Sequence, residues 1–300
     1  MRTAVAGHFH YTNGRPFRNR QIGSNGMKQN EPPLKERMPK SEEHIKRKLP
    51  SMYHQFKQLA DLDITKEPME VGPTTHYMMG GVNVDGDSQM STVPGLFAAG
   101  EVAAGLHGAN RLGGNSLSDL LVFGRRAGRF AAEFAKSNSV PAIDEAQLQA
   151  TANAALAPFD RGPAGENPYQ IQHELQESMQ DLLGIVRTES EMLRALEVIG
   201  QLSTRAERAG VAGHRQYNNG WHTAMDLANL LNVSEAITRA ALLRTESRGA
   251  QFREDFPNKG AEWGKYNIVV KRGAHGGMQV ERRPLEPLPA ALKAVIEKMK

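Results

Sequence analysis

The stretch "HGANRLGGNS", residues 107–116, places one arginine inside a run of glycines. Gly108, Gly113 and Gly114 permit positive φ and close backbone approach on both sides of Arg111. A guanidinium fork suits a planar carboxylate, which it binds through two parallel, charge-assisted hydrogen bonds. The stretch therefore favours a carboxylate-binding arginine, although a surface arginine in a flexible loop explains the same residues equally well.

A long helix is predicted directly after this loop, in "SLSDLLVFGRRAGRFAAEFAKS", residues 116–137. Asn115 is a favourable N-cap, and the free N–H groups of the first turn attract negative charge. The apolar face of this helix includes two glycines, so we expect it to pack closely against a neighbour. Its members are Leu117, Leu120, Leu121, Gly124, Ala127 and Gly128.

On the N-terminal side of the loop, "STVPGLFAAGE" (91–101) predicts a buried strand that ends at an acidic residue. The preceding "KEPMEVGPTTHYMMGGVNVD" is expected to be extended, and "GDSQ" to form a turn. Short helices are predicted from Ser41 and over 50–61, where Pro50 suits the first turn. Residues 1–40 are rich in Gly, Asn, Pro and Arg, so we expect little regular structure there.

On the C-terminal side, "SNSVPAIDEA" (137–146) is a plausible boundary between domains. From about 145 to 250 one helical pattern follows another, which predicts a helical bundle. "KYNIVVKRGAHGGMQVERRPL" alternates around a Gly-rich turn and predicts a β-hairpin. The tetrapeptide "RTES" occurs at 187–190 and at 244–247, but two short matches do not establish a repeat.

Composition is typical of a globular protein, with 23% charged and 39% hydrophobic residues among 300. The net charge is +4; residues 1–50 hold 11 Lys/Arg and 4 Asp/Glu, so they carry +7 and the remainder −3. This basic N-terminal segment has few aromatic residues and no recognisable nucleic-acid motif. We therefore expect a solvated segment and not a surface that binds nucleic acid or an anionic membrane. The absence of cysteine excludes disulfides, thiolate zinc sites and iron–sulfur clusters held by this chain's thiolates. No stretch of 18 apolar residues occurs, and we expect a cytoplasmic protein.

Three further features carry candidate chemistry. Glu101, just beyond the predicted strand, could accept hydrogen bonds from vicinal ribose hydroxyls, although a strand that ends in Gly-Glu is commonly an ordinary terminus. His76 lies in a Gly-rich turn, where an imidazole could hydrogen-bond a carboxylate, or it is structural. The charged stretch "RTESRGAQFREDFP" (244–257) is either an internal ion-pair network that docks the bundle on the neighbouring domain or a solvated face. No metal-ligand spacing, Ser/His/Asp pattern or P-loop is present.

Four motifs, taken in order, resemble the flavoprotein subunit of succinate dehydrogenase and fumarate reductase. They are "EVGPTTHYMMGGVNVD", "STVPGLFAAGEV", "HGANRLGGNSLSDLLVFGRRAG" and "RTESRGAQFREDFP". The resemblance covers roughly residues 41–285 and implies FAD as cofactor and the interconversion of succinate and fumarate. L-Aspartate oxidase is a related alternative, but its glycine loop typically has Ala-Ser where this chain has Gly113 and Gly114.

The resemblance implies roles for individual residues. His76 matches the histidine that contacts a substrate carboxylate, and Arg111 matches the arginine that clamps a carboxylate and helps to polarise the double bond. Glu101 matches the acid on the FAD ribose. Asn115, Ser116 and Leu117 lie at the helix start, where the family's backbone meets the isoalloxazine ring. The chain contains no G-x-G-x-x-G, so the family's loop for the ADP half of FAD is not found in it.

The fold class expected on this basis is α/β plus all-α. It comprises the C-terminal part of an FAD-binding and capping module with a mixed sheet, then a helical bundle and a terminal β-hairpin. The expected domains are a basic, poorly ordered arm (1–40), part of the FAD-binding and substrate region (41–138), a helical domain (139–258) and a hairpin tail (259–300).

The resemblance also implies partners: succinate or fumarate, the iron–sulfur subunit of the complex, and a separate N-terminal flavoprotein half. No nucleic acid is expected, and the inner face of the membrane is reached only through partner subunits. The alternative from another class is a truncated, non-catalytic homologue that acts as a binding or assembly module.

Overall fold

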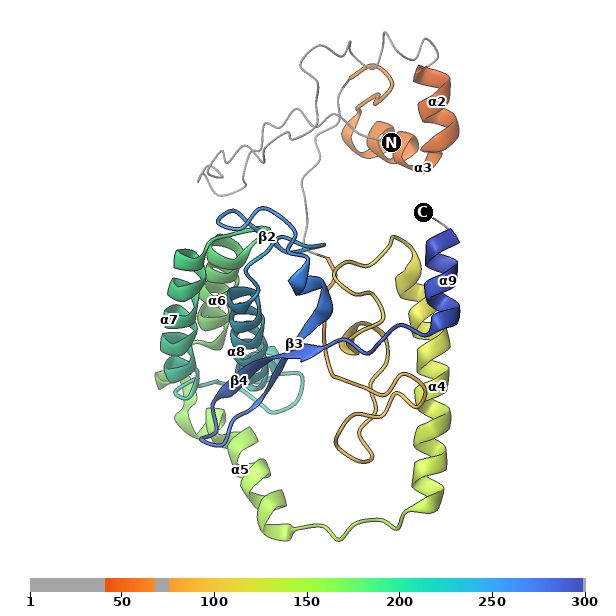
Figure 1. The fold of residues 1–300 in the computed structure, drawn as a ribbon. Helices are drawn as coiled ribbons and strands as arrows, with labels where there is room; N and C mark the ends of the chain where they lie inside the picture. Colours follow the sequence, from red (N-terminus) through yellow and green to blue (C-terminus); the bar gives the residue numbers. More distant parts are fainter. Residues whose placement is uncertain (1–40, 68–75, 299–300) are drawn as a thin grey trace. The chain divides into compact units, whose positions relative to one another are not determined.

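The computed structural model describes residues 41–67 and 76–298 (Figure 1). The expectations for the arm at 1–40 and for the first part of the extended segment lie outside these residues. The chain divides into two compact units, one ending at residue 74 and the other beginning at residue 75.

The first unit contains two helices, α2 (Ser41–Lys48) and α3 (Pro50–Ala60). Both helices were predicted, and Pro50 lies in the first turn of α3, where the missing N–H has no helical partner to lose. Asp61 ends α3 in the left-handed conformation at φ 51°, and its N–H donates to the Phe56 carbonyl.

The second unit begins with irregular backbone that leads to the 3₁₀ helix η1 (Gly100–Val102) and the long helix α4 (Asn115–Ser137). The predicted turn is present, because Asp85 Oδ1 accepts hydrogen bonds from the N–H groups of Asp87 and Ser88. The strand predicted over 91–101 is wrong. Only single bridges form there, such as Met90 with Phe97, because Pro94 and Gly95 (φ 84°) turn the chain within the run.

Four further helices follow, as the periodicity predicted: α5 (Glu145–Arg161), α6 (Pro168–Leu183), α7 (Glu189–Ala206) and α8 (Asn219–Leu243). A 3₁₀ turn, η2 (Gly162–Ala164), joins α5 to the segment before α6. Each of the four helices is preceded by a polar residue whose side chain accepts a first-turn N–H, which explains where the helix begins. These caps are Asp144, Asn167, Thr188 and Asn218.

Helices α6, α7 and α8 pack together as a bundle (Figure 1). Their buried residues recur three or four positions apart, so each helix presents one apolar stripe to the others. The main core cluster is Ile171, Leu175, Ile199, Leu202, Ala209, Leu227 and Leu231. A second cluster at the other end is Leu183, Met192 and Ala241. The partly buried Met179 packs against both clusters, so the bundle has a core of its own.

Small sheets complete the unit. Strands β1 (Val186–Arg187) and β2 (Phe252–Arg253) form a two-stranded parallel pair. After the 3₁₀ helix η3 (Glu262–Lys265), strands β3 (Tyr266–Arg272) and β4 (Met278–Pro284) form the predicted antiparallel hairpin. A final helix, α9 (Ala290–Lys298), was not predicted. The described residues are thus mixed and mainly helical with two small sheets, and the mixed sheet expected for 41–138 does not form among them.

Candidate functional site

Two segments that are distant in sequence lie side by side at the candidate site. The N–H of Val82 donates to the Val102 carbonyl at 2.7 Å, and the N–H of Ala104 donates to the Val82 carbonyl at 2.9 Å. Gly81 makes this approach possible, since a Cβ added there would overlap the Val102 carbonyl, and its φ is 147°. This pairing places the "HYMMGG" motif (76–81) next to η1, which contains Glu101.

Glu101 is exposed and joins the same two segments. Its Oε1 accepts a hydrogen bond from the backbone N–H of Met78 at 2.9 Å. Among the described residues the other carboxylate oxygen has no partner, so one oxygen fixes the side chain and the other is free to accept a hydroxyl. His76, two residues before Met78, is exposed and has no hydrogen-bond partner among the described residues.

Arg111 is half-buried in the glycine loop. Its guanidinium carbon lies 4.4 Å from the ring centroid of Tyr77, and its NH1 donates to the Leu112 carbonyl at 3.3 Å. Its Nε is buried and has no hydrogen-bond partner among the described residues. A buried donor without an acceptor costs free energy, so this nitrogen is suited to a ligand that brings an acceptor.

A largely buried hydrogen-bonded pair, His107 and Asp119, joins the start of the glycine loop to α4. His107 Nε2 lies 3.1 Å from Oδ2 of Asp119, the only buried residue of α4 among those described. The His107 ring meets Tyr77 edge to face, with 5.5 Å between centroids. Burial raises the pKa of Tyr77, and the negative charges of Asp119 and Glu101 raise it further, against the effect of Arg111.

Helix α4 begins with open donors. Gly114, not Asn115, occupies the N-cap position at φ 83°, so no side chain caps the helix, and Asn115 is its first residue. The N–H of Asn115 donates to the Leu112 carbonyl at 3.3 Å, which leaves the following first-turn N–H groups, those of Ser116 and Leu117, without a cap. Asn115 and Leu117 are exposed and Ser116 is half-buried. These donors and the helix dipole suit a partial or full negative charge.

Residues 249 and 250, which are distant in sequence, contact the same glycine loop. The N–H of Ala250 donates to the Ala109 carbonyl at 3.0 Å, and a Cβ added at Gly249 (φ 61°) would overlap that carbonyl. Residues 249 and 250 follow directly on a buried ion-pair cluster. Glu246, 1% exposed, accepts hydrogen bonds from Arg244 at 2.6 Å and from Arg248 at 2.7 Å. The cluster therefore holds the segment that contacts the glycine loop.

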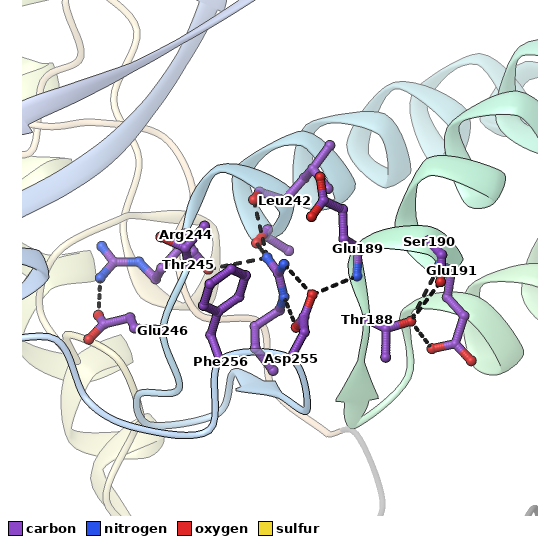
Figure 2. Close-up of polar contacts among 12 residues, drawn as sticks. Thr188, Glu189, Ser190, Glu191, Leu242, Arg244, Thr245, Glu246, Asp255 and Phe256 are labelled. Carbon is purple, nitrogen blue, oxygen red and sulfur yellow. Dashed lines mark hydrogen bonds and ion pairs between the residues drawn. The ribbon is translucent and has the colours of Figure 1, made fainter.

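A second ion pair joins this segment to the bundle, as Figure 2 shows. Arg253 is fully buried, pairs with Asp255 through two hydrogen bonds of 2.8 and 2.7 Å, and donates to the carbonyls of Ala241 and Leu242 at the end of α8. Asp255 also accepts from the N–H of Glu189 at the start of α7. The internal network predicted for 244–257 is confirmed. The network ties α7 and α8 to the hairpin, where Arg244 donates to the Tyr266 carbonyl at 3.1 Å. Its link to the glycine loop is the hydrogen bond from the Ala250 N–H to the Ala109 carbonyl.

The sequence predicted Arg111, His76, Glu101 and the start of α4 as site residues. The structure places Arg111 against Tyr77 and Glu101 against the N–H of Met78, so both contact the segment that follows His76. Sequence reasoning missed Tyr77, Asp119 and Gly249. Tyr77 follows His76 directly, and Asp119 lies in the first turns of α4. An aromatic residue next to the predicted histidine and an acid near the predicted helix start were therefore signals that the sequence offered. No signal in the sequence paired Gly249 with Ala109.

A separate open groove of about 540 Å³ lies at the start of α6 and α8, lined among others by Tyr169, His214 and Tyr217. None of the predicted site residues lines it.

Residues 41–67 and 76–298 contain no group of three or more His, Cys, Asp or Glu able to hold a metal ion. Within the same residues no helix has the length and apolar character needed to cross a membrane.

Comparison with known proteins identifies the family. Residues 172–295 match the family described as fumarate reductase flavoprotein C-term, and residues 19–117 match the FAD binding domain. The chain belongs to the succinate dehydrogenase and fumarate reductase flavoproteins. The FAD match begins at residue 19, inside the segment expected to be a divergent arm, and it implies FAD as the cofactor.

Relatives in this family include the fumarate reductase flavoprotein subunit of Mycobacterium tuberculosis, 37% identical over 80% of this chain and 42% of that protein. The succinate dehydrogenase flavoprotein subunit of Coxiella burnetii is 35% identical over 83% of this chain and 45% of that protein. Among solved structures, Mycobacterium smegmatis Sdh1 in complex with UQ1 has a TM-score of 0.76 and 47% identity, over 85% of this chain and 43% of that one. This chain thus spans less than half the length of these relatives.

The residues present fit one end of FAD. The uncapped first turn of α4 offers N–H donors to the flavin ring, and the free oxygen of Glu101 can accept a ribose hydroxyl. The phosphates find no G-x-G-x-x-G loop in this sequence. Among the described residues the α4 start and Glu101 could therefore meet a flavin ring and a ribose, and the given sequence contains no G-x-G-x-x-G for the phosphates.

Proposed function

We propose that the chain supplies the carboxylate-binding part of an FAD-dependent flavoprotein that interconverts succinate and fumarate. The observation that carries this proposal is the buried Nε of Arg111, which lacks a partner beside the uncapped start of α4. A guanidinium in this state binds a carboxylate through two parallel hydrogen bonds and gains the acceptor that its surroundings lack.

The other residues orient the dicarboxylate around this contact. His76, exposed and without a partner among the described residues, donates a hydrogen bond to a carboxylate oxygen, and Arg111 holds a carboxylate and polarises the double bond. Glu101 holds the ribose, and the backbone at Asn115, Ser116 and Leu117 contacts the flavin ring. When bound, FAD supplies the two-electron oxidation and reduction that the interconversion requires. The chain's own contribution is to fix the dicarboxylate in register with that ring.

The proposed partners follow from what the chain does not contain. It has no cysteine, so electrons would pass to an iron–sulfur subunit whose clusters are held elsewhere. It has no G-x-G-x-x-G, so a flavoprotein N-terminal half would supply the phosphate-binding loop. Such partner subunits would hold the protein at the inner face of the membrane.

Flavin retention and turnover test the proposal. The 300 residues by themselves are expected to retain little FAD in equilibrium dialysis, because contacts to the pyrophosphate provide a large share of dinucleotide affinity. Supplied with an N-terminal half that carries the loop, they are expected to become yellow and to oxidise succinate with an artificial acceptor. Stoichiometric, sub-micromolar retention of FAD by the chain alone would contradict the need for that half.

A non-catalytic binding or assembly module is the second candidate, favoured by the absence of G-x-G-x-x-G from this sequence and by Leu117 and Leu121 on α4, which are 71% and 76% exposed. The same experiment separates the two. A chain that associates with the N-terminal half yet gives no succinate oxidation is a module, and L-aspartate oxidation in place of succinate oxidation would assign it to the related oxidase branch.

A further inference from the structure

Arg111 is held in an unusual way for a half-buried arginine. No carboxylate pairs with it among the described residues, and its one hydrogen bond there goes to the carbonyl of the next residue, Leu112, at 3.3 Å. Its nearest fixed support is the face of Tyr77, 4.4 Å from the guanidinium carbon. An aromatic face attracts a guanidinium without using its N–H donors, which lie in the guanidinium plane.

This choice of support matters for a ligand-binding arginine. A protein carboxylate on Arg111 would occupy the donors that an incoming carboxylate needs, whereas a stacked ring leaves them free. A guanidinium that already rests against the ring also loses less conformational entropy when it forms two parallel hydrogen bonds to a ligand.

The ring itself is held in turn. Tyr77 meets His107 edge to face at an interplanar angle of 82°, and His107 is hydrogen-bonded to Asp119, which is 5% exposed. On its other side the chain is fixed at Met78, whose N–H donates to Glu101. Carboxylate, imidazole, phenol and guanidinium thus form a continuous series from the first turns of α4 to the candidate ligand site.

We propose that Tyr77 is a positioning residue, which holds the guanidinium of Arg111 by its ring face so that Nε and the donors not used by the Leu112 carbonyl remain available to a dicarboxylate. This inference rests on the proposed function for its consequence in turnover, but the position of Arg111 can be measured without it. The aromatic ring, and not the phenolic hydroxyl, is the part that acts.

The first measurement is the Nε–Hε correlation of Arg111 in the ¹⁵N-labelled chain, assigned by its loss in Arg111→Lys. A proton near an aromatic face is displaced by the ring current, so the wild-type signal is expected away from those of exposed arginines. Tyr77→Phe should keep this displacement and Tyr77→Leu should lose it. Tyr217→Leu, a change at a tyrosine that is 99% exposed, is the matched control and should leave the signal in place.

The Nε–Hε signal of Arg253, hydrogen-bonded to Asp255 at 2.8 Å, reports whether each variant folds. An unmoved Arg111 signal in folded Tyr77→Leu would overturn the proposal. If that variant does not fold, Tyr77→Phe decides: a retained displacement supports the proposal, and a lost one overturns it.

The second measurement is succinate oxidation by the flavoprotein completed with an N-terminal half. Loss of the stack is expected to raise the KM for succinate about tenfold in Tyr77→Leu and less than about twofold in Tyr77→Phe. Equal KM values in wild type and Tyr77→Leu would overturn the positioning role. Absence of turnover in the wild type would instead sink the proposed function, while the Arg111 signal still reports on the stack.

Discussion

The bundle of α6, α7 and α8 and the segment 76–137 belong to the same compact unit but differ in how their apolar side chains are covered. Ile171, Met192 and Leu227 in the bundle are fully buried. On α4, Leu117 is 71% and Leu121 is 76% exposed, and a Cβ added at Gly124 or Gly128 would meet no atom within 4 Å. Among the described residues, no neighbour therefore covers this part of the α4 face that was expected to pack closely.

The polar groups follow the same division. Buried charges beside the bundle are paired, as in Arg253 with Asp255, whereas the buried Nε of Arg111 has no partner among the described residues. Leucines without cover and a donor without an acceptor both mark surfaces completed by something else. The bundle thus buries its own apolar residues, whereas the exposed α4 leucines and the unpartnered Arg111 Nε agree with the proposal that a ligand and further protein complete the candidate site.

The largest expected effect is a loss of stability after a substitution beside the bundle. Arg253→Met removes one partner of a buried ion pair and leaves Asp255 and three α8-end carbonyls without their donor. We expect a loss of about 3–5 kcal/mol in the free energy of unfolding, measured by denaturant titration. Arg129→Met, at an exposed i,i+4 pair, is the control and should change it by less than about 0.5 kcal/mol. Similar values for both variants would erase the distinction between the regions.

The next effect is on function. In the completed flavoprotein, Arg111→Lys should reduce succinate turnover roughly a hundredfold, because the loss of the fork costs on the order of 2–3 kcal/mol. Poorer alignment of the reacting carbon adds to this loss. Flavin absorbance should persist, since on the proposed function Glu101, the start of α4 and the N-terminal half would hold FAD. Wild-type turnover in this variant would show that Arg111 is an ordinary loop residue.

Gly249→Ala tests the link between the two regions. The new Cβ overlaps the Ala109 carbonyl at a backbone position of φ 61°, so the glycine loop must shift. We expect a loss of about 1–3 kcal/mol in the free energy of unfolding together with weaker succinate binding in the completed flavoprotein. Gly276→Ala, at φ 85° in the hairpin turn with open space around it, is the control for backbone strain alone. Equal succinate binding in both variants would separate the loop from the network.

The pH dependence of stability should come from the network. Hydrogen bonds from Arg253 lower the pKa of Asp255. Burial of this carboxyl acts in the opposite direction but is the smaller effect. Burial would raise the pKa of Glu246, but hydrogen bonds from Arg248, the Gly260 N–H and Arg244 outweigh it and lower that pKa. Carboxylates with lowered pKa stabilise the fold above their unfolded values of 3.8 and 4.5, and this contribution is lost as pH falls through the folded values.

The free energy of unfolding, measured from about pH 7 down to about pH 3, is therefore expected to fall at the acidic end. Asp255→Asn should flatten part of that decrease. An unchanged slope in this variant would mean that the pair does not titrate with unfolding.

The smallest effect on stability is expected on α4. Leu117→Glu with Leu121→Lys removes two exposed leucines and should change the free energy of unfolding by less than about 0.5 kcal/mol each. Binding of an apolar dye and concentration-dependent association, followed by sedimentation, should both decrease. Leu193→Glu, at a leucine of α7 that is 47% exposed, is the control within the bundle. A wild-type chain that neither binds dye nor associates would refute the idea of an unfinished surface.

The sequence by itself determined the elements whose information is local. The apolar spacing predicted the bundle helices, and alternation around a glycine turn predicted the hairpin. The caps Asn167, Thr188 and Asn218 were not predicted, although they too are local signals. The four motifs also identified the family, because their order and residue types are specific. Spacing of three, four or two residues is a property of the chain alone, so these features needed no tertiary information.

Only the tertiary structure decided which residues meet. It replaced the strand expected at 91–101 by single bridges, brought Tyr77 under Arg111, and set Gly249 against Ala109, 140 positions away in sequence. It also left the α4 leucines uncovered, although their spacing is that of a packed face. Periodicity tells which face of an element is apolar, but the neighbour that covers the face, or the ligand that completes a guanidinium, is fixed by contacts between distant segments.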